Sequence, residues 1–140
     1  MLPLLLLAAL LSPHEPQSPL AVVQALMDGM AAHDAARIRP LFTPGARLVL
    51  VADGKVVLDV TGDEFARRAA AGRDEILERL RNPKVEVRGA IASVWSEYDF
   101  LRAGARTHCG IDAFLLLKTP AGWKIFSAES TVEKEGCPAL

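Results

Sequence analysis

Residues 90–132 read AIASVWSEYDFLRAGARTHCGIDAFLLLKTPAGWKIFSAESTV, and they carry the main evidence for the fold class. Three runs rich in β-branched, aromatic and leucine residues, Ala90–Leu101, Arg106–Lys118 and Trp123–Val132, are separated by short turn-forming segments. Consecutive strands joined by tight turns are antiparallel neighbours. The stretch therefore predicts a long antiparallel meander, and the alternating run Lys84–Arg88 predicts a short strand before it.

Residues 18–42 favour two helices. Ser18 followed by Pro19 is a good helix start, because the hydroxyl can cap the first turn and proline loses no hydrogen bond there. Apolar residues then recur at spacings of three and four, as on one face of a helix: Val22, Val23, Leu26, Met27 and Met30. Asp34 can cap a second, short helix over 35–42, which Pro40 ends or bends.

A β-hairpin and a third helix are predicted next. Arg47–Val51 and Val56–Val60 are joined by Asp53-Gly54, which is a strong hairpin signal. Thr61-Gly62-Asp63-Glu64 has the spacing of a capping box and should begin the helix. We expect Gly72 to break this helix in the middle. Its buried face would comprise Phe65, Ala69, Ile76, Leu77 and Leu80.

This order of elements predicts an α+β domain. An antiparallel sheet needs one face covered, and the helices are the only elements available to cover it. N-terminal helices packed in the curve of a strongly curved antiparallel sheet form a cone-like roll with one open end. The 140 residues suffice for one domain. We expect it over 19–137, behind a leader and proline-rich linker at 1–18.

The leader contains one strongly apolar run, Leu2–Leu11, which at ten residues is too short to cross a bilayer as a helix. Such a run is typical of a secretory signal and predicts an exported protein, periplasmic or secreted, rather than a cytoplasmic one. No Lys or Arg precedes it, and no small-x-small cleavage site follows it. A mis-assigned start codon or a simple apolar leader is the alternative.

The composition argues against several kinds of partner. Sixteen basic and seventeen acidic side chains give a net charge of −1, whereas nucleic-acid and membrane-surface partners need clustered positive charge. No phosphate loop, dinucleotide fingerprint or metal-ligand spacing is found, so we expect no cofactor, no metal and no integral membrane segment. Cys109 and Cys137 would form one disulfide in an exported protein and remain free thiols in a cytosolic one.

Strand parity indicates which polar groups can meet. His108, Asp112, Phe114 and Leu116 share one face of their strand. If Lys118 faces Trp123, the register sets Asp112 opposite Glu129, Phe114 opposite Ser127 and Leu116 opposite Ile125. Two facing buried carboxylates would repel, so that one would hold its proton more tightly, as general acid–base catalysis requires. A solvated strand end with two exposed acids is the alternative.

Two questions about this face stay open. His108 and Asp112 lie four residues apart, roughly 13 Å along a strand, so they can share a cavity but form a dyad only if Gly110 marks a bulge. The turn at 102–105 decides which aromatic residues lie on the His108 face. One turn length brings Trp95 and Asp99 there, and another brings Tyr98 and Phe100.

Three runs carry a resemblance to a known family: VWSEYDF at 94–100, HCGIDAF at 108–114 and GWKI at 122–125. Over about residues 19–137 the chain resembles the nuclear transport factor 2-like superfamily, in particular the SnoaL-like branch labelled putative lumazine-binding. The resemblance implies a cystatin-like cone with an apolar pocket and dimerisation through the sheet. Relatives include isomerases, cyclases and dehydratases beside proteins that only bind, so the fold does not fix the reaction.

We therefore predict a domain that binds a small hydrophobic molecule in an apolar pocket without a clear catalytic set. The expected ligand-binding residues are Met27, Phe42, Trp95, Tyr98, Phe114, Leu116, Trp123 and Glu129, with Asp112 and His108 as polar anchors. The alternative is an isomerase, cyclase or hydratase that uses Asp112 with His108 as acid or base on a hydrophobic cyclic substrate. A purely structural dimer module is the third reading.

Overall fold

The computed structural model describes residues 18–139. The elements follow the order α1 (Pro19–Ala31), α2 (Ala35–Ile38), a 3₁₀ turn (Arg39–Leu41), β1 (Phe42–Ala52), β2 (Lys55–Thr61), α3 (Gly62–Ala71), β3 (Ile76–Arg88), β4 (Ile91–Arg102), β5 (Ala105–Thr119) and β6 (Gly122–Thr131). The predicted leader lies outside the described residues, apart from Ser18. Within the described part of the chain, no helix is long and apolar enough to cross a bilayer.

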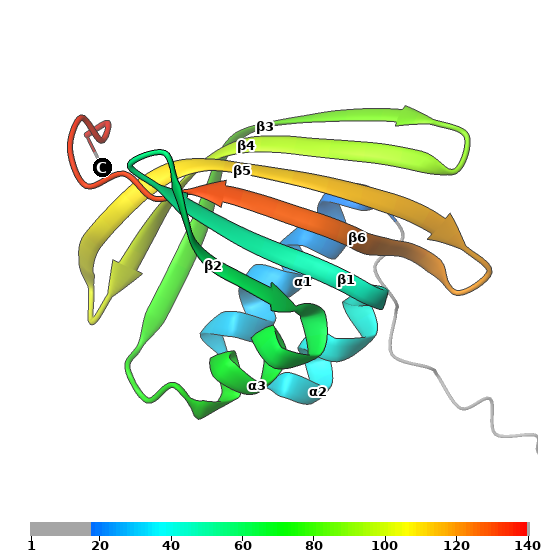
Figure 1. The fold of residues 1–140 in the computed structure, drawn as a ribbon, viewed down its shortest axis with the longest axis horizontal. Coiled ribbons are helices and arrows are strands. Elements are labelled where there is room, and N and C mark those ends of the chain that lie inside the picture. Colours follow the sequence, from blue (N-terminus) through cyan, green and yellow to red (C-terminus); the bar gives the residue numbers. More distant parts are fainter. Residues whose placement is uncertain (1–17, 140) are drawn as a thin grey trace, which may run out of the picture.

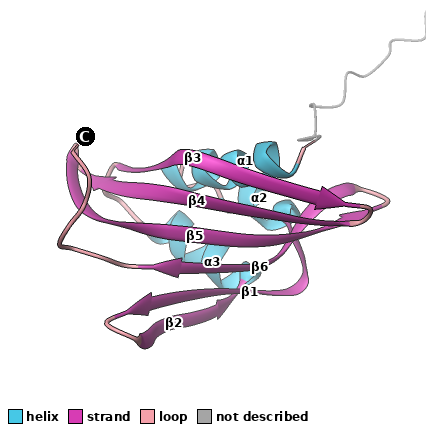
Figure 2. Cartoon of the chain, turned by 90° about the horizontal axis from the view of Figure 1, so that it is seen from above, coloured by secondary structure: helices cyan, strands magenta, loops and turns pink. Residues whose placement is uncertain are grey.

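Six strands form one curved sheet with the order β2-β1-β6-β5-β4-β3. Every neighbouring pair is antiparallel except β1 and β6, which run parallel. The three helices lie together under one face of the sheet, and the opposite face carries no helix (Figures 1 and 2). The predicted α+β cone is therefore confirmed, and we call the helix-covered face concave and the opposite face outer.

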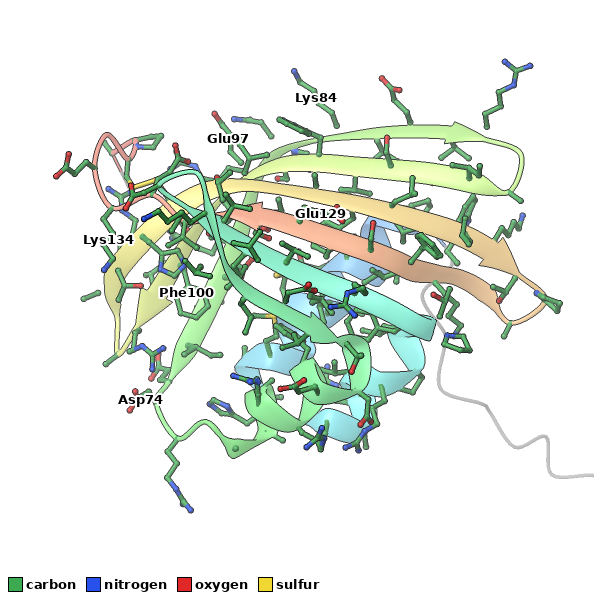
Figure 3. The ribbon with its side chains drawn as sticks, viewed as in Figure 1. Asp74, Lys84, Glu97, Phe100, Glu129 and Lys134 are labelled. Atoms are coloured by element: carbon green, nitrogen blue, oxygen red, sulfur yellow. A yellow bond between two sulfur atoms is a disulfide. The ribbon has the colours of Figure 1, made fainter. Side chains whose placement is uncertain are left out.

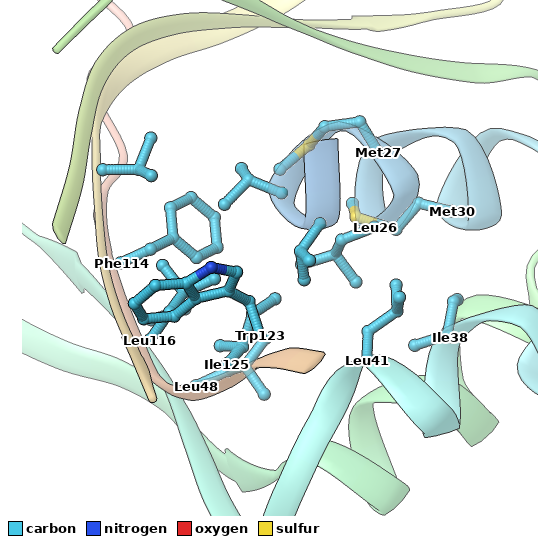
Figure 4. Packing of buried hydrophobic residues seen from close by; sticks show 14 of the residues in the cluster. Leu26, Met27, Met30, Ile38, Leu41, Leu48, Phe114, Leu116, Trp123 and Ile125 are labelled. Atoms are coloured by element: carbon cyan, nitrogen blue, oxygen red, sulfur yellow. The ribbon is translucent and has the colours of Figure 1, made fainter. Parts of the chain in front are cut away.

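Local sequence signals position the helices. Ser18 Oγ accepts a hydrogen bond from the Ala21 amide and caps α1, which buries the apolar stripe predicted from spacing. Asp34 caps α2, and Thr61 caps α3 by accepting from the Glu64 amide. The buried side chains of α1 meet those of the sheet and form one core (Figure 4), with contributions from Leu26, Met27, Met30, Ile38, Leu41, Leu48, Phe114, Leu116, Trp123 and Ile125.

Part of the expected third helix is wrong. α3 ends at Ala71, and residues 76–80 belong to β3, which pairs along β4 from Ile76 opposite Arg102. The long β4 strand offers a full row of unpaired backbone groups, and pairing with β3 satisfies them. Side chains of 76–80 alternate between the two faces, with Leu80 inside and Leu77 exposed, so the period is that of a strand.

The expected register between β5 and β6 is also wrong in part. Leu116 lies opposite Ile125 as predicted, but a bulge beyond this pair sets Phe114 opposite Ala128 and Asp112 opposite Ser130. The extra residue of a bulge shifts every later pair by one and turns its side chains to the other face. Glu129 therefore faces away from the helices, and the predicted Asp112–Glu129 pair does not form.

A second irregularity settles which aromatic residues of β4 face inward. Ala103 and Gly104 form a two-residue turn with φ of 49° and 79°, as a type I′ hairpin requires. A bulge between the pairs Phe100–His108 and Leu101–Arg106 then reverses the parity expected from so short a turn. Tyr98 is thus buried on the concave face, whereas Trp95 is 54% exposed on the outer face.

Candidate functional site

A cavity of about 340 Å³ lies between α1, α3 and the concave face of the sheet. Its walls are mainly aliphatic and aromatic, with Leu26, Met27, Met30, Leu48, Leu50, Leu58, Phe65, Ile76, Tyr98, Phe100 and Phe114 among the lining residues. Polar groups interrupt this lining at Glu78, His108, Asp112 and Ser130. Figure 3 shows Phe100 inside the curve of the sheet, at the end of the molecule that also carries Asp74 and Lys134.

Asp112 is the most buried polar group of the cavity wall, at 1% exposure. It lies in the middle of β5, between Ser96 of β4 and Ser130 of β6. Its Oδ1 accepts a hydrogen bond of 2.6 Å from Ser130 Oγ. Its Oδ2 is buried and receives no N–H or O–H donor from the described residues. Such an unpaired oxygen is costly in a protein interior and marks a place where a ligand or a proton can be held.

Glu78 of β3 brings a second carboxyl group to the same wall. Burial, followed by the charge of Asp112, raises the pKa of Glu78 well above its usual range. Burial also raises the pKa of Asp112, although its contact with Glu78 and the hydrogen bond from Ser130 oppose this increase. Two carboxyl groups at one buried wall are not readily ionised together, because burial and like charge both disfavour the second carboxylate. The pair therefore keeps one proton in the range where ordinary acids are ionised.

His108 lies on the same face, toward the open end. Its ring stacks on Phe100 with centroids 4.9 Å apart, and it meets Tyr98 edge to face at 5.8 Å. Thr107 Oγ1 lies 2.9 Å from its Nδ1. Burial, with the positive charges of Lys134 and Arg102, lowers the pKa of His108. The imidazole is therefore neutral at pH 7 and can donate or accept a hydrogen bond.

Tyr98 is held by a close approach between strands. Its hydroxyl donates a hydrogen bond of 2.5 Å to the Thr131 carbonyl oxygen, across β5. This is possible because Gly110 lies between them, where a Cβ atom would overlap Thr131. Burial, with the nearby Glu78 and Asp112, raises the pKa of Tyr98. The tyrosine therefore stays neutral and presents its ring to the cavity.

Residues 17–129 match the protein family described as "putative lumazine-binding". The chain belongs to this family. Its fold is similar to that of an NTF2-like protein with a cystatin-like fold from Novosphingobium aromaticivorans, with a TM-score of 0.69 and 17% identity over 83% of this chain and 79% of that chain. The resemblance inferred from the three sequence runs, and the nuclear transport factor 2-like (NTF2-like) fold it implied, are thus confirmed.

Two further solved structures support the NTF2-like fold. One is described as a putative dehydratase of the NTF2-like family from Streptomyces avermitilis, with a TM-score of 0.65 and 21% identity over 85% of this chain and 91% of that chain. The other is described as a putative aromatic ring hydroxylase from Novosphingobium aromaticivorans, with a TM-score of 0.64 and 18% identity over 84% and 85%. No curated protein matches the chain significantly. The fold and family together support a small-molecule-binding domain.

This lumazine-binding-family domain brings half of the predicted site residues to the cavity: Met27, Tyr98, His108, Asp112 and Phe114 line it. Leu116 and Trp123 are buried in the core beside it, and Phe42 packs edge to face on Phe65 near the start of β1. Trp95 and Glu129 lie on the outer face, for the register reasons given above. No hydrogen bond joins His108 to Asp112 among the described residues, so both share the cavity without forming a dyad.

Glu78 and Ser130 are the polar groups that the sequence interpretation missed. Glu78 was assigned to a helix, so its alternation with Ile76 and Leu80 in a strand was not used. That alternation places one carboxylate on an otherwise apolar face, which is a detectable signal. Ser130 lies opposite Asp112, where Glu129 was predicted, because of the bulge in β6. Within residues 18–139, no group of three or more His, Cys, Asp and Glu side chains could hold a metal ion.

A disulfide joins the C-terminal segment to β5 at the outer face of the sheet. Cys109 of β5 is bonded to Cys137, with their Cα atoms 5.9 Å apart. Arg81 and Arg106 also hold this C-terminal segment, by donating to the carbonyl oxygens of Ala139 and Pro138. Of the two predicted alternatives, a disulfide or two free thiols, the structure therefore shows the disulfide.

Proposed function

We propose that the cavity binds a small, flat and mainly apolar molecule that presents an N–H group beside a carbonyl to Asp112 and Glu78. The observation that carries the proposal is the buried Asp112 Oδ2, which lacks an N–H or O–H donor at the wall of an apolar cavity. Ligand sites combine such apolar walls with a few placed polar groups. The volume of about 340 Å³ suits a molecule of two or three fused rings.

The carboxyl pair explains the kind of polar edge expected. Two carboxyl groups that share one proton offer an acceptor and a donor side by side. A cyclic amide or imide offers the complementary donor and acceptor. Lumazine, the compound in the family's description, is a flat bicycle with such edges. We therefore propose a lumazine-like heterocycle as the ligand class.

The test compares lumazine with 1,3-dimethyllumazine by calorimetric titration. Methylation removes both ring N–H donors and keeps the flat shape of the ring system, while adding two methyl groups. We expect lumazine to bind more tightly by about tenfold or more, because a buried acceptor left unpaired costs about 1–3 kcal/mol. Equal affinities, or no binding of lumazine, would contradict the proposal.

Two variants locate the binding. Asp112→Asn replaces the unpaired acceptor with an amide of the same size, and we expect it to abolish the preference for lumazine over its dimethyl derivative. Glu129→Gln is the matched control, because Glu129 is an exposed carboxylate on the outer face of the neighbouring strand. The control should retain the full preference.

A second function is favoured by the shared proton itself. A carboxyl group of raised pKa beside a carboxylate can act as general acid or base, as the alternative of an isomerase, cyclase or hydratase requires. The reaction would move a proton on a bound cyclic molecule at Asp112. His108, which lies on the same face, could receive or supply that proton through the bound molecule.

Hydrogen exchange distinguishes catalysis from binding alone. A ligand that co-purifies with the domain is incubated with it in D₂O, and its mass is followed over time after its N–H and O–H positions have been exchanged back in H₂O. Catalysis predicts uptake of deuterium at carbon with the wild-type protein and none with Asp112→Asn. A ligand whose mass stays unchanged with the wild-type protein supports binding alone.

A further inference from the structure

The two ends of the cavity differ in charge. Asp112 and Glu78 lie at the buried wall, whereas two arginines, Arg68 of α3 and Arg102 at the end of β4, line the cavity from its exposed side. Their side chains are 59% and 52% exposed, against 1% for Asp112. The arginines therefore form part of the rim, and the carboxyl pair forms the interior.

Each rim arginine has one carboxylate partner and unused donors. Arg68 donates from Nε and Nη2 to the same oxygen of Glu64, at 3.1 and 2.7 Å. Arg102 donates from Nη1 to Asp74 Oδ2 at 2.7 Å. Both pairs are exposed, and exposed ion pairs are weak and easily rearranged. Arg68 Nη1 and Arg102 Nε and Nη2 have no hydrogen-bond acceptor within the described part of the chain.

Positive side chains also act on His108, which lines the same cavity as the two arginines. Arg102 and Lys134 both lower the pKa of His108, after burial, and no carboxylate raises it. Figure 3 shows Asp74 and Lys134 at the same end of the molecule as Phe100, which stacks on His108.

We infer that the ligand is an amphipathic anion, a flat apolar molecule with a carboxylate, sulfonate or phosphate group that binds Arg68 and Arg102. This inference rests on the proposed function, because it assigns the second end of the same ligand. The buried carboxyl pair would repel an anionic group, and the rim attracts it. The two ends therefore fix one orientation, with the anion at the entrance and the uncharged polar edge inside.

Two fluorescent probes test the inference: 1-anilinonaphthalene-8-sulfonate and N-phenyl-1-naphthylamine. They share the fused rings and the anilino N–H, and they differ by the sulfonate. We expect the sulfonate probe to bind more tightly, and its advantage to fall as salt rises from about 0.05 to 0.5 M, because exposed charges are screened. The neutral probe should show little salt dependence.

Substitutions then assign the charge to the rim. Arg68→Gln and Arg102→Gln should each weaken the sulfonate probe by about fivefold to tenfold, as expected for a charge-assisted hydrogen bond at a half-exposed position. Both should leave the neutral probe unchanged. Arg47→Gln is the matched control, since Arg47 is a similarly exposed arginine paired with Asp59 on the β1–β2 hairpin. The control should change neither probe.

The outcomes separate this inference from the proposed function. Equal affinities for the two probes, or equal losses of both in the Arg68 and Arg102 variants, would overturn the anion inference and leave the apolar cavity standing. Failure of both probes to bind would overturn the anion inference, whereas the proposed function is overturned by the lumazine titration alone. Weakening of the sulfonate probe by Arg47→Gln would overturn the assignment to the rim.

Discussion

At the scale of single residues, Glu78 and Asp112 place two carboxyl groups at one buried wall. Asp99, on the outer face, is instead a carboxylate paired with an arginine. Asp99 accepts two hydrogen bonds from Arg79, at 2.8 and 2.7 Å, and these lower its pKa. Asp112 meets a serine and another carboxyl group instead. Asp99 is held as a carboxylate by its partners, whereas the inner pair retains a proton.

The inner pair predicts a pH dependence of stability. A carboxyl group whose pKa is raised by folding favours the folded state fully below its unfolded pKa of about 4. This contribution is lost as the pH rises through the folded pKa. The loss amounts to about 1.4 kcal/mol for each unit by which the folded pKa exceeds the unfolded pKa. Glu78→Gln removes the titration at this position. We therefore expect the variant to gain stability relative to wild type between pH 4 and pH 8.

Chemical denaturation at several pH values measures this difference. The two unfolding free energies should differ least near pH 4 and separate steadily above it. A difference that stays constant from pH 4 to pH 8 would show that Glu78 titrates normally in the folded protein. Glu86→Gln, at an exposed position of the same strand, controls for the loss of a surface charge.

Gly110 carries a second prediction at this scale. A Cβ atom at this position would overlap the Thr131 carbonyl group, which is the acceptor of the Tyr98 hydroxyl. Gly110→Ala should therefore cost about 1–3 kcal/mol or more of unfolding free energy, because crowding of packed backbone is relieved only by movement of a strand. Tyr98→Phe tests the same contact from the other side, and we expect a smaller loss. Unchanged stability of Gly110→Ala would refute the close approach.

At the scale of elements, the sequence predicted most of the fold and only part of the site. Capping residues and apolar spacing predicted α1 and α2, and Asp53-Gly54 predicted the β1–β2 hairpin, because these signals act over a few residues. Residues 76–80 were predicted as helix because their partner strand is distant in sequence. Bulges in β5 and β6 changed the face of Tyr98 and Ser130, and no local residue type announced them.

The C-terminal disulfide belongs to this scale, because it ties the segment after β6 back to β5. It spans 28 residues of sequence, and cross-linking a loop of that length stabilises by about 2–4 kcal/mol, mainly through the unfolded chain. Reduction, or the double substitution Cys109→Ala with Cys137→Ala, should lower the unfolding free energy by this amount. A reduced protein of unchanged stability would contradict the prediction.

Disulfides persist in oxidising compartments, so we propose that the domain works in the periplasm or outside the cell. The apolar run Leu2–Leu11 supports the same proposal from the sequence. Thiol counting on protein isolated from its own compartment tests it. We expect no free thiol before reduction and two after it. Two free thiols in the untreated protein would contradict the proposal.

At the scale of the whole molecule, the helices cover the concave face, and the outer face keeps exposed apolar side chains. Ile91, Trp95 and Phe126 are 55%, 54% and 48% exposed. The first two lie on β4 and Phe126 lies on β6, with Leu115 and Leu117 of β5 between them. Exposed apolar patches of this kind mark interaction surfaces. We therefore propose that two copies associate through this face, as the family resemblance implied.

Sedimentation analysis tests the proposed dimer. The wild-type protein should sediment as a dimer at micromolar concentration, and Trp95→Glu or Phe126→Glu should yield folded monomers, because each buries a charge in the interface. Val56→Glu is the control, since Val56 is similarly exposed but lies on β2 at the edge of the sheet. A monomeric wild type, or dimeric Trp95 and Phe126 variants, would contradict the proposal.

A crystal structure of the domain with lumazine would test whether the apolar cavity holds a ligand through Asp112. We expect the ring system between α1 and the concave face, with a ring nitrogen about 3 Å from Asp112 Oδ2, as a hydrogen bond requires. Lumazine bound on the outer face, or a cavity that stays empty at saturating lumazine, would show that Asp112 does not hold the ligand.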